Sequence, residues 1–327
     1  MQILDSGSER ALDYFVLDVF TQTRLTGNPL AVVLNPGTLT SETMLAIARE
    51  MNLSETTFVE RREAAVERLE GVRVRIFTTE EELPFAGHPT LGTASLLRAI
   101  APECVEGDTV TLALNVGAVP VRFEAQAEGA AEWPVRGEMT QRDPEFGEIL
   151  DPAEVAALTG LAVEDFDPAR PIQIVSTGTA FAIVPLRSVQ GLARLRVRQD
   201  EAGAFLRARG ARWFYVLGPT GAAASTEPAW RARMQFAGGE DPATGSAAGC
   251  AISHLVHHGA VASDAMVHLR QGVEMNRPSD LFLRASLRSD SSGASNKALG
   301  EAQKGNVTNV RVGGSTILVA KGRLFLS

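Results

Sequence analysis

Apolar residues recur along the chain with two periods, and these periods predict a protein of mixed strands and helices. Residues 72–77 alternate apolar and arginine side chains, which is typical of a strand with one buried face. Residues 41–51 carry apolar side chains on one broad face at helical spacing. A helix is therefore expected there, with Ser41 as its N-cap.

The same patterns predict the other elements. Helices are expected at 152–158 and 200–209, and strands at 14–20, 30–34, just after Glu55, 109–114, 119–123, 172–175, 181–185, 213–217, 230–236, 267–269, 281–287, 310–312, 316–320 and 323–326. Residues 124–152 lose the period and gain Gly, Pro and charge, so the domain boundary is expected within them. Residues 288–307 are rich in Ser, Gly, Asn and Lys, which indicates a mobile surface segment.

Two glycine-containing loops share one design. Residues 85–94 and 238–249 each place a polar residue directly before a proline, His88 in the first and Asp241 in the second. Small residues then lead into an apolar helix, which in the second case is expected to begin near residue 243 and to end before Gly259. Small side chains leave the first N–H groups of a helix open to an anion. Either loop alone is compatible with an ordinary helix start, but the pair favours a site.

The order of elements before each loop is also repeated. Each half of the chain runs from strands and a helix to a further strand, a glycine loop and an apolar helix. This weak duplication has too long a period for a solenoid. We therefore expect two similar domains, with both helix starts facing one cleft.

Composition narrows the class of protein. A chain of 327 residues with 45% hydrophobic and 21% charged residues has room for about two globular domains. The formal charge of -8 argues against nucleic acid as a partner, and the absence of an 18-residue apolar run argues against a membrane partner. The first dozen residues lack the pattern of a secretory signal. Cys104 and Cys250 cannot form a disulfide framework, so a cytoplasmic location is expected.

Several long motifs together resemble the phenazine-biosynthesis isomerase family (PhzF-like), a relative of the diaminopimelate epimerases. They are residues 18–20, 27–32, 52–58, 85–94, 240–248, 271–275 and 277–279. The resemblance implies an α+β fold of two similar domains, each a barrel-like set of strands wrapped around a central helix, with the active site in the cleft between them. It also implies an N-terminal domain at 13–135 completed by residues 309–327, a C-terminal domain at 145–308, and a possible homodimer.

Glu55 matches the general acid/base position of that family. It falls between the end of one predicted helix and the start of a strand, with Leu53 and Phe58 nearby. Partial desolvation there would raise the pKa of a carboxyl toward working pH. Such a group can take a proton from a carbon beside an unsaturated system and return it elsewhere. The alternative is a surface residue that caps a helix.

The resemblance assigns His88 and Asp241 to the polar groups of a substrate. His88 could donate to a ring hydroxyl or assist proton movement, and Asp241 could accept from an amine or hydroxyl. The alternative for both is that they cap their own helices. Gly87, Gly245 and Ser246 offer donors suited to a substrate carboxylate. Asn28 either reaches the site or serves as a turn residue.

Other chemistries are less well supported. The epimerase relatives use two cysteines, whereas the corresponding loops here carry His88 and Asp241, and Cys250 is expected in the core. His254, His257 and His258 lack a carboxylate at metal-ligand spacing, so neither a metal nor a cofactor is expected.

The predicted function is a cofactor-independent isomerase of a small unsaturated or cyclic carboxylic acid, resembling trans-2,3-dihydro-3-hydroxyanthranilate isomerase. The alternatives are an epimerase or tautomerase of another small acid, and a non-catalytic small-molecule binding protein.

Overall fold

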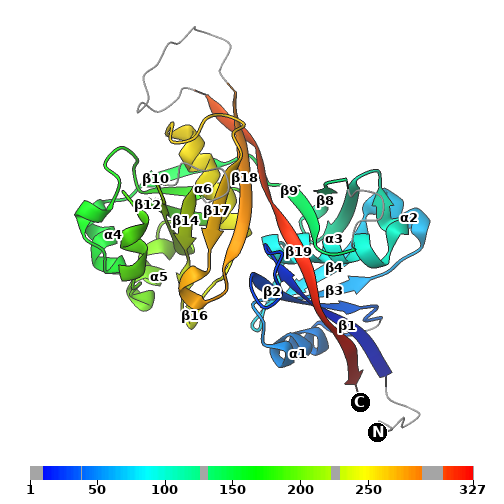
Figure 1. Ribbon diagram of the computed structural model, residues 1–327. Helices are drawn as coiled ribbons and strands as arrows, with labels where there is room; N and C mark the ends of the chain where they lie inside the picture. Colours follow the sequence, from blue (N-terminus) through cyan, green and yellow to red (C-terminus); the bar gives the residue numbers. More distant parts are fainter. Residues whose placement is uncertain (1–9, 38, 126–131, 222–228, 289–304, 327) are drawn as a thin grey trace. The chain divides into compact units, whose positions relative to one another are not determined.

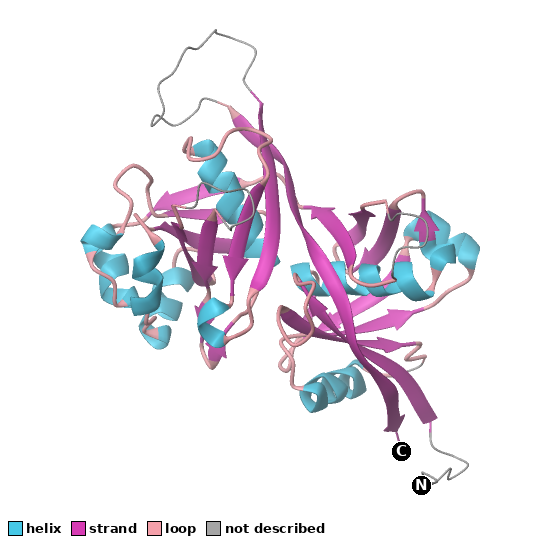
Figure 2. Cartoon of the chain, in the orientation of Figure 1, coloured by secondary structure: helices cyan, strands magenta, loops and turns pink. Residues whose placement is uncertain are grey.

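The computed structural model describes residues 10–37, 39–125, 132–221, 229–288 and 305–326 (Figure 1). Contacts divide the chain into two compact units. Unit 1 consists of Met1–Leu25, Pro29–Gly137 and Thr316–Ser327, and unit 2 of Thr26–Asn28 and Glu138–Ser315. Both units combine strands with a few helices (Figure 2). Most of the segment predicted to be mobile, residues 289–304, lies outside the described residues.

Unit 1 is built on a mixed sheet. Strand β3 pairs in parallel with β2 and antiparallel with β4, and β4 pairs in parallel with β7. Strand β1 pairs antiparallel with the end of the last strand, β19. The helices are α1 (Ser41–Met51), α2 (Ala64–Glu70) and α3 (Gly87–Ile100), and the strands are β1 (Arg10–Val19), β2 (Asn28–Leu34), β3 (Thr56–Glu60), β4 (Val72–Phe77), β5 (Glu82–Leu83), β6 (Val105–Glu106), β7 (Thr109–Leu114) and β8 (Gly117–Phe123).

Helix α3 is the central helix of unit 1. It contacts β1, β3, β7 and β8, and its residues from Gly87 to Leu97 are all buried. A helix that is buried on every side needs small residues where strands come close. A Cβ atom at Gly92 would lie 2.6 Å from Leu30 Cδ2 and 2.7 Å from Val19 Cγ2. The glycine therefore lets α3 lie directly against β1 and β2.

Unit 2 repeats this plan around α6 (Gly245–His257), which contacts β11, β12 and β18. Its strands alternate between parallel and antiparallel pairs from β11 to β18. The other helices are α4 (Pro152–Thr159) and α5 (Gln199–Arg207), and the strands are β9 (Val135–Thr140), β10 (Glu145–Ile149), β11 (Gln173–Ser176), β12 (Ala180–Pro185), β13 (Trp213–Pro219), β14 (Trp230–Arg233), β15 (Gln235–Phe236), β16 (Gly239–Glu240), β17 (Val267–Gln271), β18 (Ser279–Arg288) and β19 (Asn306–Leu326). Two of these strands are shared with unit 1: β9 belongs to unit 1 up to Gly137, and β19 belongs to unit 1 from Thr316.

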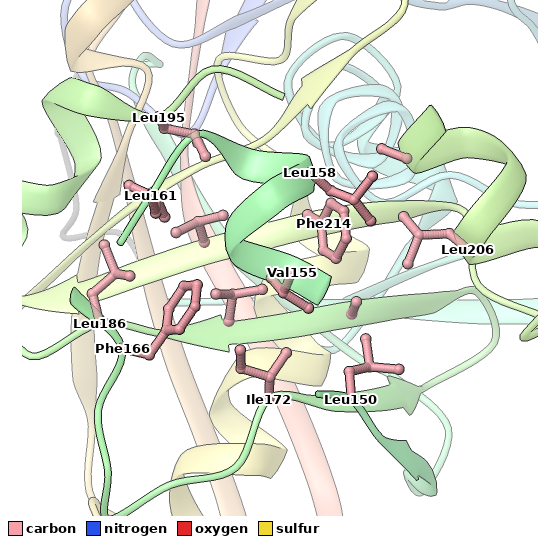
Figure 3. Packing of buried hydrophobic residues seen from close by; sticks show 14 of the residues in the cluster. Leu150, Val155, Leu158, Leu161, Phe166, Ile172, Leu186, Leu195, Leu206 and Phe214 are labelled. Atoms are coloured by element: carbon pink, nitrogen blue, oxygen red, sulfur yellow. The ribbon is translucent and has the colours of Figure 1, made fainter. Parts of the chain in front are cut away.

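A second hydrophobic layer covers the outer face of the unit 2 sheet (Figure 3). Val155 and Leu158 of α4 and Leu206 of α5 pack with Phe214 of β13 in one buried cluster. The alternate residue Tyr215 is also buried, so β13 is covered on both of its faces. This burial of both faces fits the continuous apolar sequence of β13 from Phe214 to Leu217.

Four local predictions were wrong. The N-cap of α1 is Thr40, whose side chain accepts from the Thr43 N–H, and not Ser41. Helix α6 begins at Gly245 and not near 243, because Asp241 and Pro242 belong to the loop. The predicted strand at 230–236 is broken at Met234 into β14 and β15. The three short strands predicted at the C-terminal end are one strand, β19, in which Gly322 leaves room for Tyr14 on the paired strand β1.

Other elements were missed. Strands β9 and β10 occupy part of the 124–152 segment, and the short helix α2 precedes β4. Among the described residues, no helix combines the length and the apolar character that a membrane crossing requires.

Candidate active site

Glu55 and His88 come together in unit 1. Helix α1 ends at Met51, and Glu55 directly precedes β3, while His88 lies in the first turn of α3. Their closest atoms, Glu55 Oε2 and His88 Nε2, are 3.5 Å apart. The side chains are 17% and 6% exposed, so this pair of polar groups is largely removed from water.

The His88 ring is neutral at physiological pH. Burial lowers its pKa to about 3, against the opposing effect of a hydrogen bond to the Pro29 carbonyl. A neutral imidazole has one N–H donor and one acceptor nitrogen. Because the single N–H of the neutral ring donates to the Pro29 carbonyl, the nitrogen that faces Glu55, Nε2, is an acceptor, and it can accept from the Glu55 carboxyl when that carboxyl is protonated. His88 can therefore hydrogen-bond to the protonated form of Glu55.

Asp241 is held by a set of neutral donors in unit 2. The Thr244 hydroxyl donates to Asp241 Oδ2 over 2.6 Å, and Asn28 Nδ2 donates to Asp241 Oδ1 over 2.8 Å. Asn28 Nδ2 also donates to the Ala243 carbonyl over 2.9 Å. Asn28 is completely buried, and its two hydrogen bonds place its amide against the second glycine loop, residues 238–249.

Burial and hydrogen bonding act in opposite directions on Asp241. Burial raises the pKa of this carboxyl to about 6, while hydrogen bonds from Thr244, Asn28 and the Ala243 backbone lower it. The carboxyl is mainly ionised at neutral pH. It can then accept a hydrogen bond from an amine or hydroxyl.

The remaining predicted residues lie at the two helix starts. Gly87 is the first residue of α3, Gly245 is the first residue of α6, and Ser246 follows it. The N-cap positions are Ala86 and Thr244, and neither side chain caps its helix. His88 and Asp241 thus do not occupy the cap positions that the alternative interpretation gave them.

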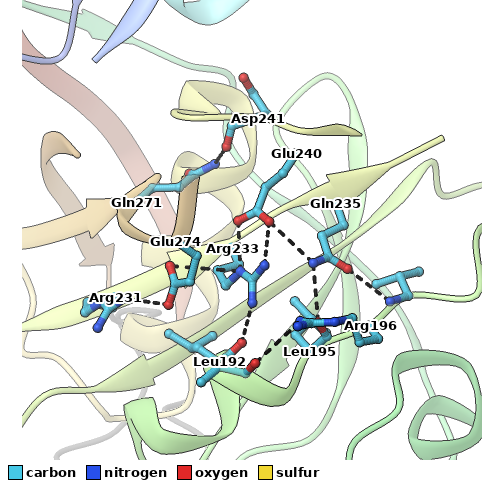
Figure 4. A network of polar contacts seen from close by, with 12 residues as sticks. Leu192, Leu195, Arg196, Arg231, Arg233, Gln235, Glu240, Asp241, Gln271 and Glu274 are labelled. Carbon is cyan, nitrogen blue, oxygen red and sulfur yellow. Dashed lines mark hydrogen bonds and ion pairs between the residues drawn. The ribbon is translucent and has the colours of Figure 1, made fainter. Parts of the chain in front are cut away.

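A network of ion pairs surrounds the strand that leads to Asp241 (Figure 4). Arg233 of β14 donates to both carboxylate oxygens of Glu240, at 2.8 and 2.6 Å, and to the Leu192 carbonyl at 2.6 Å. Arg231 pairs with Glu274 over 2.5 Å. The contacts of Arg233 fix Glu240, the residue that directly precedes Asp241.

Three residues of this region were not predicted as part of the site. Gln271, Thr244 and Tyr215 form a buried hydrogen-bonded group beside Asp241. Thr244 and Gln271 lie within sequence motifs that carry the family resemblance. Tyr215 lies in an ordinary apolar strand, where the sequence gives no signal.

The two cysteines and the histidine group have other surroundings. Cys250 is completely buried, and burial raises the pKa of its thiol to about 11, which confirms its predicted place in the core. His254 Nε2 contacts the Pro171 carbonyl, and His258 Nε2 contacts Gln173 Oε1. Within the part of the chain that the structure describes, no group of three or more His, Cys, Asp or Glu side chains is arranged to hold a metal ion.

Comparison with known proteins gives consistent matches over nearly the whole chain. The family model described as "Phenazine biosynthesis-like protein" matches residues 17–322. The trans-2,3-dihydro-3-hydroxyanthranilate isomerase of Pseudomonas aeruginosa is 35% identical over 316 residues, covering 96% of this chain and 99% of that protein.

Solved structures agree with this match. A protein of Pseudomonas aeruginosa described as a predicted epimerase is 32% identical, with a TM-score of 0.75 and coverage of 97% of this chain and 100% of that chain. A hydroxyproline epimerase from Agrobacterium vitis, only 10% identical, has a TM-score of 0.59 with coverage of 97% and 92%, and so shares the fold alone. The predicted epimerase-like fold of mixed strands and helices is confirmed, and it includes a closed eight-stranded barrel.

Proposed function

Because the chain belongs to the phenazine biosynthesis-like family, we propose that it moves a proton on a small unsaturated or cyclic carboxylic acid, with Glu55 as the general acid and base. Its relatives are named isomerases or epimerases, and the chain is an isomerase. The first substrate to consider is the one in the relative's name, trans-2,3-dihydro-3-hydroxyanthranilate.

The observation that carries this proposal is the buried pair of Glu55 and His88, with 3.5 Å between Oε2 and Nε2. A carboxylate base takes a proton from a carbon beside the unsaturated system, so that a C–H bond breaks and an O–H bond forms on Glu55. The double bonds shift, and the proton returns to another carbon of the same face. No electrons are gained or lost, and the neutral His88 ring can accept a hydrogen bond from Glu55 once Glu55 has taken up the proton.

The residues of unit 2 have a binding role in this proposal. The ionised Asp241 carboxylate accepts a hydrogen bond from an amine or hydroxyl of the substrate. The open N–H groups at the start of α6, at Gly245 and Ser246, suit a carboxylate, as do those at Gly87 in α3. The cleft shared by the two domains, which the resemblance implies, stays a prediction.

The experiment is proton exchange followed by NMR in D2O, with trans-2,3-dihydro-3-hydroxyanthranilate and a panel of small unsaturated and amino acids. Glu55→Gln keeps the shape of the side chain and removes its basicity. We expect it to bind as the wild type does and to lose about 10³-fold in kcat. Glu60→Gln, at the other end of β3, is the matched control and should retain full activity.

Two results would change the assignment. Equal turnover by the wild type and Glu55→Gln would exclude Glu55 as the acid and base. Binding of a carboxylic acid by the wild type without exchange at any carbon, across the whole panel, would favour the non-catalytic binding protein over the isomerase.

Two further parts of the proposal concern the cellular location and the oligomeric state. A cytoplasmic location is supported by the free state of Cys104 and Cys250. The possible homodimer stays a prediction, which light scattering on the purified protein would test.

A further inference from the structure

We propose that Gln271 is a positioning residue that acts through the Thr244 hydroxyl to hold the Asp241 carboxylate ionised and aimed at the substrate. This inference rests on the binding role proposed for Asp241. It concerns side chains that have no assigned part in the reaction.

Both the nitrogen and the oxygen of the Gln271 amide form hydrogen bonds to the loop that carries Asp241. Its Nε2 donates to the Asp241 carbonyl over 2.7 Å and to Thr244 Oγ1 over 3.0 Å. Its Oε1 accepts from the Thr244 N–H over 3.1 Å and from the Tyr215 hydroxyl over 2.9 Å. Gln271 and Tyr215 are completely buried, so a lost bond here would not be replaced by water.

These bonds fix the direction of the Thr244 hydroxyl. A hydroxyl has one hydrogen and accepts through its lone pairs. Because Oγ1 accepts the Gln271 N–H, its own hydrogen is free to point at Asp241 Oδ2, which is 2.6 Å away. Gln271 thereby sets Thr244 as a donor, and a donor stabilises the ionised form of a carboxyl.

The backbone next to Gln271 fits closely against the same loop. Gly272 has a φ of +76°, and a Cβ atom there would lie 2.7 Å from the Pro242 carbonyl oxygen. On the preceding side, Glu240 is held by Arg233. The loop is thus fixed at Glu240, Asp241, Pro242 and Thr244, which leaves the Asp241 side chain little freedom to turn.

The charged and titratable groups around Asp241 do not stabilise its ionised carboxyl in place of the Thr244 hydroxyl. Glu240, its chain neighbour, raises the pKa of Asp241 through its negative charge. Burial, and secondarily the negative charge of Asp241, raise the pKa of Tyr215, which stays a neutral phenol and donates to Gln271. The groups that favour the ionised carboxyl are the neutral donors Thr244, Asn28 and the Ala243 backbone.

The test is a ¹³C NMR titration of the Asp241 carboxyl, combined with kcat and KM as a function of pH. In Gln271→Leu and in Thr244→Val the Asp241 titration should move upward by about one pH unit, since one hydrogen bond to the ionised form is lost. KM at pH 6 to 7 should rise more than kcat falls. Thr244→Ser keeps the hydroxyl and should behave as the wild type does.

The matched control is Gln173→Leu. Gln173 is also a nearly buried amide of unit 2, but its contacts are the Gly147 carbonyl and His258. This variant should leave the Asp241 titration unchanged. If Gln271→Leu does not fold, the comparison of Thr244→Val with Thr244→Ser still tests the hydroxyl through which Gln271 is proposed to act.

An unchanged Asp241 titration in Thr244→Val, or an equal shift in Gln173→Leu, would overturn the positioning role. The titration does not depend on turnover. A wild type that converts no substrate would therefore overturn the proposed function while the positioning of Asp241 could still be measured.

Discussion

At the scale of single residues, two neighbouring carboxylates have different partners. Glu240 is bound on both oxygens by the Arg233 guanidinium, and the two side chains are 12% and 6% exposed. Asp241 is bound by neutral donors only, and burial raises its pKa to about 6. The fixed cation is therefore used by Glu240, while Asp241 keeps a charge that a substrate group can bind.

Arg233→Met should destabilise the protein strongly, because it leaves Glu240 buried without its cation. Removal of one partner from a buried pair typically lowers the free energy of unfolding by about 3 kcal/mol or more. Arg198→Met breaks the exposed pair with Glu201, 57% and 54% exposed, and should cost less than about 1 kcal/mol. Urea denaturation of both variants measures the difference. Equal losses would show that the Arg233 network is not a buried ion pair in solution.

At the scale of elements, the close packing of the central helix α3 depends on the absence of a Cβ atom at Gly92. The atoms nearest to a Cβ atom built at Gly92 are methyl groups of Leu30 and Val19, and these cannot easily move because both side chains are completely buried in strands. Gly203 in α5 is different, because the nearest atom to a Cβ there is the Nη1 end of the flexible Arg207 side chain, at 2.9 Å.

The two glycines should therefore respond to alanine with opposite signs. Gly92→Ala is expected to lower the free energy of unfolding by about 2 kcal/mol through overpacking. Gly203→Ala should raise it by up to about 1 kcal/mol, since alanine is the better helix former. Thermal or urea unfolding tests both. A stabilised Gly92→Ala variant would mean that α3 does not pack closely against β1 and β2.

At the scale of the whole molecule, buried histidines predict a loss of stability in acid. Burial lowers the pKa of His88 and of His254 to about 3, whereas histidine in an unfolded chain titrates near 6.5. Between these values the unfolded state binds more protons, so the free energy of unfolding falls as the pH falls. Asp241 acts in the opposite direction, since its raised pKa lets the folded state bind a proton between pH 6 and 3.8.

From pH 7 to pH 5 each of the two histidines should lower the free energy of unfolding by about 2 kcal/mol, and Asp241 should raise it by about 1 kcal/mol. Denaturant unfolding at a series of pH values measures the sum. His254→Gln keeps a donor for the Pro171 carbonyl and should flatten the dependence by about one histidine's share. A free energy of unfolding that stays constant from pH 7 to pH 5 would contradict this account.

Much of the fold followed from local patterns. The alternation at β4 and the helical face of α1 are properties of consecutive residues; β4 has the predicted bounds, and α1 ends at Met51 as predicted but begins one residue earlier than an N-cap at Ser41 implies. The periodicity of residues did not predict an element correctly where pairing with another strand decides the structure. The glycines of β19 read as breaks, yet Gly322 lies opposite Tyr14 within one continuous strand, and the period of residues 124–152 was too weak to reveal β9 and β10.

The sequence by itself determined the candidate site residues, because its motifs place Glu55, His88 and Asp241 beside element boundaries. Only the tertiary structure decided their electrostatic state, since a pKa depends on burial and on donors that come from distant parts of the chain. His88 is neutral because it is enclosed, and Asp241 meets Asn28 across 213 positions of sequence. The contact of Gln271 with Thr244 and Tyr215 is of the same kind, because these residues lie 27 and 56 positions from Gln271 in the sequence and meet only in the folded chain.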